Sequence, residues 1–127
     1  MASSSSSTYL YGAAALVVVG LVVFAANNSV GQGAPSPYDG FAQCLTDASV
    51  TMYGAWWCPH CESQKDIFGS AFDSVNYVEC STASRNMNQT CRDAGIEGYP
   101  TWDFGDGSRM SGKQTLETLA QKSGCSL

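Results

Sequence analysis

The sequence predicts an α/β fold in which a small mixed sheet is flanked by helices, with a single N-terminal transmembrane helix. Three observations support this prediction. A β-prone run at residues 50–53 is followed directly by helical periodicity over residues 58–72. An Asp-Gly step between the β-prone runs 101–104 and 108–110 indicates a hairpin. An uncharged apolar stretch of eighteen residues, 9–26, is long enough to cross a membrane as a helix.

Each element of the folded part has a local signal. Phe41 and Leu45 share one side of a short helix, and Ile67, Phe68 and Phe72 recur at helical spacing. Gly95 marks the end of a short helix, as glycine often does. In order, the predicted elements are helix 38–45 with a turn at 46–48, strand 50–53 ending at Gly54, helix 58–72, strand 76–79, helix 89–94, hairpin 101–104 with 108–110, and helix 115–122.

The distribution of charge divides the chain. All six Lys and Arg and all eleven Asp and Glu fall at or after Asp39, so the net charge of −5 belongs to the C-terminal part. No cluster of basic residues is present in the sequence, which argues against nucleic acid as a partner. We predict a disordered N-terminus at 1–8, a transmembrane anchor or signal at 9–26, a flexible linker at 27–37 and one folded domain at 38–127.

The apolar stretch at 9–26 is interpreted as a retained membrane anchor. A cleaved signal peptide and a buried soluble helix are the alternatives. A signal peptide usually begins with a basic region, whereas residues 3–7 carry no charge, and the best cleavage candidate, at 29–31, is a poor match. Neither flank holds a nearby Lys or Arg, so the charge rule for membrane orientation gives no answer.

The cysteine content indicates an oxidising compartment. Six cysteines in about ninety residues is a high and even number, which suits disulfide pairing outside the cytosol. Cys80 and Cys91 close a polar loop after a strand, so we interpret them as a structural disulfide, with an electron-relay pair as the alternative. Elimination leaves Cys44 and Cys125, which would tie the first helix to the last, although four cysteines allow three connectivities.

The close pair Cys58 and Cys61 carries the predicted chemistry. Both open a helix directly after a strand, where free backbone N–H groups and the helix dipole stabilise the Cys58 thiolate. Pro59 suits the first helical turn, and His60, the single histidine of the chain, adds positive charge beside the sulfur when protonated. Because the Cys58 thiolate is stabilised, the Cys58–Cys61 disulfide is more easily reduced and is a better oxidant of other thiols. The predicted catalytic residues are Cys58, Cys61, His60 and Pro59.

Two other interpretations of Cys58 and Cys61 were weighed. A purely structural bridge between cysteines so close in sequence gains little chain entropy. A zinc site would need a second close pair, whereas Cys80 and Cys91 stand eleven residues apart. Redox activity is therefore the interpretation, and we expect no metal and no cofactor.

Two motifs resemble those of thioredoxin-fold proteins. Residues 57–61, Trp-Cys-Pro-His-Cys, resemble the active site of that fold, with the Pro-His centre of DsbA-type oxidases. Residues 95–101, Gly-Ile-Glu-Gly-Tyr-Pro-Thr, resemble its cis-proline loop, which lies against the cysteines and offers backbone groups to an extended peptide. The resemblance implies a thioredoxin-like fold and a cis peptide before Pro100. The substrate-binding residues that it implies are Tyr99, Pro100, Thr101 and Trp57.

A narrower resemblance is to the thioredoxin-like domain associated with vitamin K epoxide reductase homologues of bacterial and plastid membranes. Residues 52–61, 77–80 and 99–102 are similar to that domain in order and spacing. In that family a membrane reductase homologue passes oxidising equivalents through quinone to this domain, which oxidises secreted proteins. Because the multi-helix reductase part is not in this sequence, the resemblance implies a separate quinone-linked partner, kept close by the anchor. The implied location is the periplasm, the thylakoid lumen or an equivalent compartment.

One position departs from the thioredoxin pattern. Thioredoxins and DsbA-type proteins carry a carboxylate six residues before the first active-site cysteine, where this chain has Met52. No obvious internal base then remains to deprotonate Cys61. This favours an oxidase, in which Cys61 leaves, over a reductase, in which Cys61 attacks.

The sequence therefore predicts a membrane-tethered thiol–disulfide oxidoreductase of the protein disulfide oxidase type. Its expected partners are protein thiols and a vitamin K epoxide reductase-like membrane oxidase. Two alternatives remain: a reductase or isomerase that uses the same cysteine pair, and a tethered binding module with a degenerate redox site.

Overall fold

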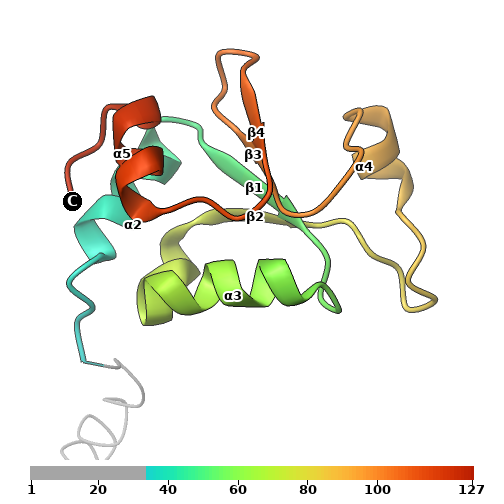
Figure 1. Cartoon of the computed structure of the whole chain (residues 1–127), viewed down its shortest axis with the longest axis horizontal. Coiled ribbons are helices and arrows are strands. Elements are labelled where there is room, and N and C mark those ends of the chain that lie inside the picture. Colours follow the sequence, from blue (N-terminus) through green and yellow to red (C-terminus); the bar gives the residue numbers. More distant parts are fainter. Residues whose placement is uncertain (1–33) are drawn as a thin grey trace, which may run out of the picture. The chain divides into compact units, whose positions relative to one another are not determined.

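The computed structural model describes residues 34–127. Its strands form one four-stranded sheet, and Figure 1 shows α3 along one side of this sheet, α2 and α5 together at one end, and α4 at the other. The helices are α2 (Asp39–Asp47), α3 (Pro59–Phe68), the 3-10 helix η1 (Gly69–Ser74), α4 (Gln89–Asp93) and α5 (Leu116–Ser123), and the strands are β1 (Thr51–Gly54), β2 (Asn76–Glu79), β3 (Thr101–Asp103) and β4 (Arg109–Ser111).

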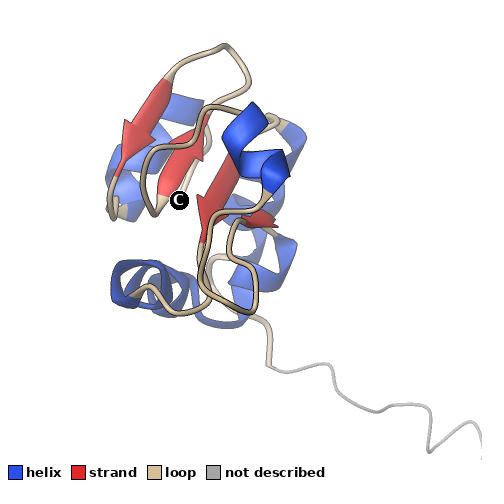
Figure 2. Ribbon diagram, turned by 90° about the vertical axis from the view of Figure 1, so that its right-hand side faces the viewer, coloured by secondary structure: helices blue, strands red, loops and turns tan. Residues whose placement is uncertain are grey.

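The sheet is mixed, with β1 at its centre in the order β2-β1-β3-β4. β1 runs parallel to β2 and antiparallel to β3, and β3 and β4 form an antiparallel hairpin. Helices lie on more than one side of the strands (Figure 2). The predicted small mixed sheet flanked by helices is therefore confirmed, and the architecture fits a thioredoxin-like fold.

The main core lies between the sheet and α3. Met52 of β1 and Trp102 of β3 are opposite each other in the antiparallel register, and both are fully buried. The Trp102 ring lies 6.1 Å from the ring of Phe68 in α3, and Phe41 of α2 stacks on Phe68 at 5.9 Å between centroids. This aromatic cluster fixes α3, and with it the start of the helix where the cysteine pair lies.

The opposite face of β1 and β2 packs against a smaller cluster. Tyr53 and Val78 contact the buried residues Cys80, Cys91 and Ile96. Because successive side chains of a strand point to opposite faces, Tyr53 lies on the face away from Met52. The two clusters together cover both faces of the central strand.

Two helix boundaries differ from the prediction. The first helix continues through Asp47 where a turn was predicted at 46–48, because the Thr46 hydroxyl donates to the Ser74 carbonyl at 2.6 Å and anchors this last turn. The helix after the cysteine pair was predicted to reach residue 72, but α3 ends at Phe68. Gly69 has φ of +57°, outside the right-handed helical region, and a 3-10 helix follows it.

A buried glutamine joins α3 to the segment before α5. Gln64 Oε1 accepts from the Gln114 backbone N–H at 2.6 Å and from Trp102 Nε1–H at 3.4 Å, and Gln64 Nε2 donates to the Gln114 carbonyl at 3.0 Å.

We expect Gln64→Leu to lower the free energy of unfolding by about 2–3 kcal/mol, because it leaves these groups without partners. Urea denaturation measures this change. Gln43→Leu, at an exposed site on α2, serves as the control and should change stability by less than about 0.5 kcal/mol; equal effects of the two substitutions would contradict the role of Gln64.

Within residues 34–127, no helix combines the length and the apolar character that a membrane crossing requires. The predicted anchor at 9–26, the N-terminus at 1–8 and most of the linker at 27–37 lie outside the described residues.

Candidate active site

Cys58 lies at the junction between β1 and α3. It is the N-cap residue of α3, and Pro59 follows it as the first helical residue. The Cys58 backbone N–H donates to the Ala55 carbonyl at 3.0 Å, and the Cys58 carbonyl accepts from Glu62 N–H at 3.1 Å, so a turn and the first helical bond fix its backbone. The residue is buried, with 6% of its surface exposed, and it lies at the positive end of the helix.

Cys61 lies one turn into α3 and is 1% exposed. Burial, with a smaller contribution from the neighbouring Cys58, raises the pKa of the Cys61 thiol to about 12, against the opposing effect of the Ala55 backbone N–H. Among the described residues, Cys58 and Cys61 are the two cysteines outside disulfides. The pair is therefore asymmetric: both cysteines are buried, but Cys58 is the more exposed of the two, and Cys61 is protonated at neutral pH.

The loop before β3 faces the Cys58 sulfur. The peptide between Tyr99 and Pro100 is cis, and the Tyr99 carbonyl lies 3.8 Å from Cys58 Sγ, which donates to it. Pro100 and Thr101 are buried, and the Thr101 hydroxyl donates to the Gly98 carbonyl at 2.8 Å. We therefore expect a bound peptide to meet the backbone of this loop rather than the Thr101 side chain.

Two exposed tryptophans border the cysteine pair and are held by the loop after β2. Trp57 is 37% exposed, and its indole N–H donates to Ser81 Oγ at 2.7 Å. Trp56 is 52% exposed, donates from its indole to the Thr82 carbonyl at 3.4 Å, and has the Arg85 guanidinium 5.3 Å from its ring. The Trp57 ring also meets the Tyr99 ring edge-on at 6.1 Å. The loop therefore fixes the apolar surface beside Cys58.

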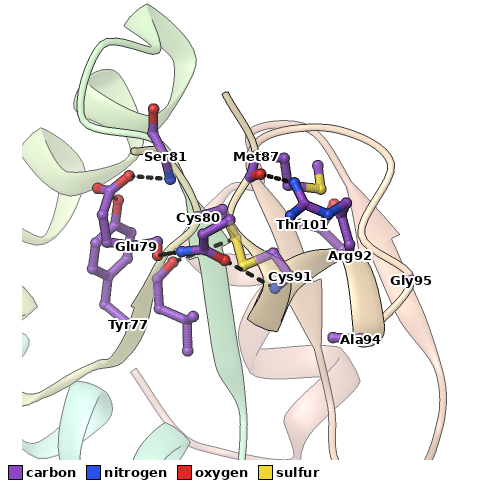
Figure 3. Close-up of a disulfide and its surroundings, with 12 residues drawn as sticks. Tyr77, Glu79, Cys80, Ser81, Met87, Cys91, Arg92, Ala94, Gly95 and Thr101 are labelled. Carbon is purple, nitrogen blue, oxygen red and sulfur yellow. Dashed lines mark hydrogen bonds between the residues drawn. A yellow bond between two sulfur atoms is a disulfide. The ribbon is translucent and has the colours of Figure 1, made fainter. Parts of the chain in front are cut away.

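A disulfide between Cys80 and Cys91 closes this loop (Figure 3). Asn88 supports it, because its side chain donates to the Glu79 carbonyl at 2.7 Å and accepts from Cys91 N–H at 3.0 Å. Both cysteines are fully buried. The second disulfide joins Cys44 of α2 to Cys125 after α5, with 5.9 Å between the Cα atoms. These are the two pairs that the sequence indicated.

Two residues that the sequence did not identify as site residues, Gly54 and Tyr77, lie beside Cys61, and a third, Glu79, is bonded to Tyr77. Gly54, at the end of β1, has no side chain, and a Cβ there would lie 2.8 Å from Tyr77 Cε2 and 3.1 Å from Cys61 Sγ. The Tyr77 hydroxyl donates to Glu79 Oε2 at 2.8 Å. Burial and the bond to Glu79 raise the pKa of the Tyr77 hydroxyl. The parallel pairing of β1 with β2 brings these residues together, and no short-range sequence signal reports that pairing.

The structure thus brings several of the predicted site residues to one place. Cys58, Cys61, Trp57 and Tyr99 lie together at the start of α3, with Pro100 and Thr101 behind the Tyr99 carbonyl. Pro59 and His60 are exposed on the first turn between the two sulfurs. The tuning role of His60 and the substrate-binding role of the 99–101 segment stay predictions.

Comparison with known proteins shows a similarity to a plant oxidoreductase. Thiol-disulfide oxidoreductase LTO1 of Arabidopsis thaliana is 42% identical over 98 residues, which cover 72% of this chain and 26% of the relative. The chain thus spans about a quarter of the length of the curated relative that it matches. No family model matches the chain. The likeness, the mixed α/β architecture and the disulfides together support a thioredoxin-like thiol–disulfide oxidoreductase.

Proposed function

We propose that this chain is a membrane-tethered oxidase of protein thiols in an extracytosolic compartment. The observation that carries the proposal is the pair of free cysteines at the start of α3, in which Cys58 is 6% exposed and Cys61 is 1% exposed. The Tyr99 carbonyl lies 3.8 Å from Cys58 Sγ, and the Trp57 ring meets the Tyr99 ring, so both groups would border a sulfur that approached Cys58. As the more exposed of the two, Cys58 is the better placed to form a bond to another protein.

The reaction begins with Cys58 and Cys61 joined by a disulfide. A substrate thiolate attacks Cys58 Sγ, a substrate–Cys58 disulfide forms, and Cys61 leaves as a thiolate that takes up a proton. A second substrate thiolate then attacks the substrate sulfur of this mixed disulfide and releases the Cys58 thiolate. The substrate has lost two electrons and gained a disulfide, and the pair is now reduced.

Re-oxidation completes the cycle. We assign it to a vitamin K epoxide reductase-like membrane protein linked to quinone, held in the same membrane by the predicted anchor at 9–26. The Cys58 thiolate would attack a disulfide of that partner, and Cys61 would then close the internal bond. The resemblance of residues 52–61, 77–80 and 99–102 to the thioredoxin-like domain associated with such reductase homologues is what supports this assignment.

The reduction potential tests the direction of electron flow. We expect the full-length chain, equilibrated in glutathione buffers and alkylated, to give a value near about −120 mV, as strong protein oxidases do. The oxidised chain should also introduce disulfides into reduced, unfolded ribonuclease. A potential near about −270 mV, typical of thioredoxin, would assign the same site to a reductase and contradict the oxidase proposal.

A further inference from the structure

The buried thiol of Cys61 needs a proton acceptor. Cys61 must become a thiolate whenever it attacks a mixed disulfide on Cys58, both in re-oxidation by a partner and in release of a trapped substrate. Its thiol is 1% exposed, and burial raises its pKa to about 12. Few thiolates therefore form spontaneously at neutral pH, and bulk solvent has little access to the sulfur.

The absence of a side chain at Gly54 opens the interior toward β2. The point where a Cβ of residue 54 would lie is 3.0 Å from the Tyr77 hydroxyl oxygen and 3.1 Å from Cys61 Sγ. The two atoms therefore cannot be farther apart than the sum of these distances, a gap that one bridging water molecule can span. Tyr77 is thus a polar group beside the Cys61 sulfur, and it comes from a different strand than Met52.

The Tyr77 hydroxyl is bonded to a fixed carboxylate. It donates to Glu79 Oε2 at 2.8 Å, and Glu79 Oε1 accepts from the backbone N–H groups of Ser81 at 2.8 Å and Trp56 at 3.2 Å. Figure 3 shows the Tyr77 and Glu79 side chains lying together at the end of β2. Backbone bonds from two segments hold the carboxylate in place, so it can accept a proton without reorientation.

We propose that Tyr77 and Glu79 form the proton path of Cys61, in the place where the sequence showed no internal base. The Tyr77 oxygen takes the proton of the Cys61 thiol while the Tyr77 hydroxyl gives its own proton to Glu79. The products are a Cys61 thiolate, a neutral tyrosine and a protonated Glu79, and the thiolate then attacks Cys58 Sγ and expels the bound sulfur. The same path returns the proton when Cys61 leaves in the oxidase direction.

Other charged or titratable groups act on the same sulfur. Lys65 Nζ lies 3.9 Å from the centre of the Tyr77 ring, where a cation stabilises negative charge that develops on the phenol oxygen. Lys65 also favours the Cys61 thiolate, whereas the Cys58 thiolate disfavours it. The titratable or charged groups that interact with Cys61 from α3, β2 and the loop before β3 are Cys58, Lys65, Tyr77 and Tyr99, and Glu79 acts on the two tyrosines.

The reaction of the reduced full-length chain with dithiobis(nitrobenzoate) separates the two steps. Attack by Cys58 releases a first thionitrobenzoate, and attack by Cys61 on the resulting mixed disulfide releases a second. In stopped-flow absorbance, we expect Tyr77→Phe and Glu79→Gln each to slow the second phase by about 100-fold at neutral pH, as loss of a general base does. The first phase should stay within about twofold, which also shows that each variant is folded.

The pH profile distinguishes a proton path from a structural role. In the wild type the second phase should change little across neutral pH, because the acceptor is internal. In both variants it should rise about tenfold per pH unit, because hydroxide must then remove the proton. Tyr53→Phe is the matched control, since Tyr53 lies on the adjacent strand but packs against the Cys80 and Cys91 cluster on the other face.

The outcomes separate this inference from the proposed function on which it rests. A second phase in Tyr77→Phe and Glu79→Gln that matches the wild type in rate and pH dependence would overturn the proton path while the redox function stands. A wild-type chain that releases only one thionitrobenzoate would instead remove the proposed function itself. Slowing in Tyr53→Phe equal to that in Tyr77→Phe would likewise overturn the proton path, because the effect would then be one of packing.

Discussion

Replacing Cys58 by serine is expected to abolish thiol–disulfide exchange, with a loss of about three orders of magnitude or more. Cys58 is the more exposed of the two cysteines, and Cys61, at 1% exposed, is too buried to take its place. A hydroxyl at position 58 can neither form a disulfide nor leave as a stable anion. Oxidation of reduced ribonuclease by the full-length chain measures the loss.

Cys61→Ser is expected to have a different effect. Cys58 can still form a mixed disulfide with another protein. Because no internal thiol then resolves this mixed disulfide, adducts on Cys58 accumulate. Mass spectrometry of these adducts would identify both substrates and the oxidising partner. The double Cys58→Ser, Cys61→Ser variant should trap nothing, and equal amounts of adduct on the double variant would rule out Cys58 as the attacking sulfur.

Removal of the Cys44–Cys125 disulfide is expected to give the largest loss of stability. The bridge joins residues 81 apart in sequence and links α2 to the end of the chain, so it restricts most of the unfolded domain. The chain-entropy relation gives a loss of about 4.5 kcal/mol for the double serine variant. The midpoint of urea unfolding under non-reducing conditions measures it.

The second disulfide provides the comparison. Cys80 and Cys91 are 11 residues apart in sequence, and for this separation the same relation gives a loss of stability of about 3 kcal/mol. The loss should be centred on the loop that holds Trp56 and Trp57. We therefore expect the serine pair at 44 and 125 to unfold at lower urea than the pair at 80 and 91. The reverse order would show that strain or residual structure in the unfolded chain outweighs loop length.

The order of elements could be predicted because its signals are local. The Asp106-Gly107 step lies in the turn of a hairpin in which β3 pairs with β4, and Gly105 and Gly107 both have positive φ. The predicted ends of the helices are less accurate, because contacts with residues distant in sequence determine where a helix ends. Thr46 extends α2 through a bond to the Ser74 carbonyl, 28 residues away, which no local pattern reports.

The cysteine pair was likewise identifiable from its spacing, but its surroundings were not. The sequence pattern predicts a proton partner of Cys61 at position 52, on the strand that leads into α3, where this chain has Met52. The residue that lies beside Cys61 is instead Tyr77 of β2, bonded to Glu79, and a parallel register that pairs Gly54 with Glu79 brings it there. Gly54 was interpreted only as the end of a strand, whereas its missing side chain is what admits the Tyr77 ring.

Mapping the thiols across a redox titration tests most directly whether Cys58 and Cys61 are the working pair. The full-length chain is equilibrated in dithiol and disulfide buffers, alkylated with light and heavy reagents before and after reduction, and analysed peptide by peptide. We expect Cys58 and Cys61 to change together in one two-electron step while the other four cysteines stay paired. A first step at Cys80 and Cys91, with Cys58 and Cys61 never joined, would contradict the account.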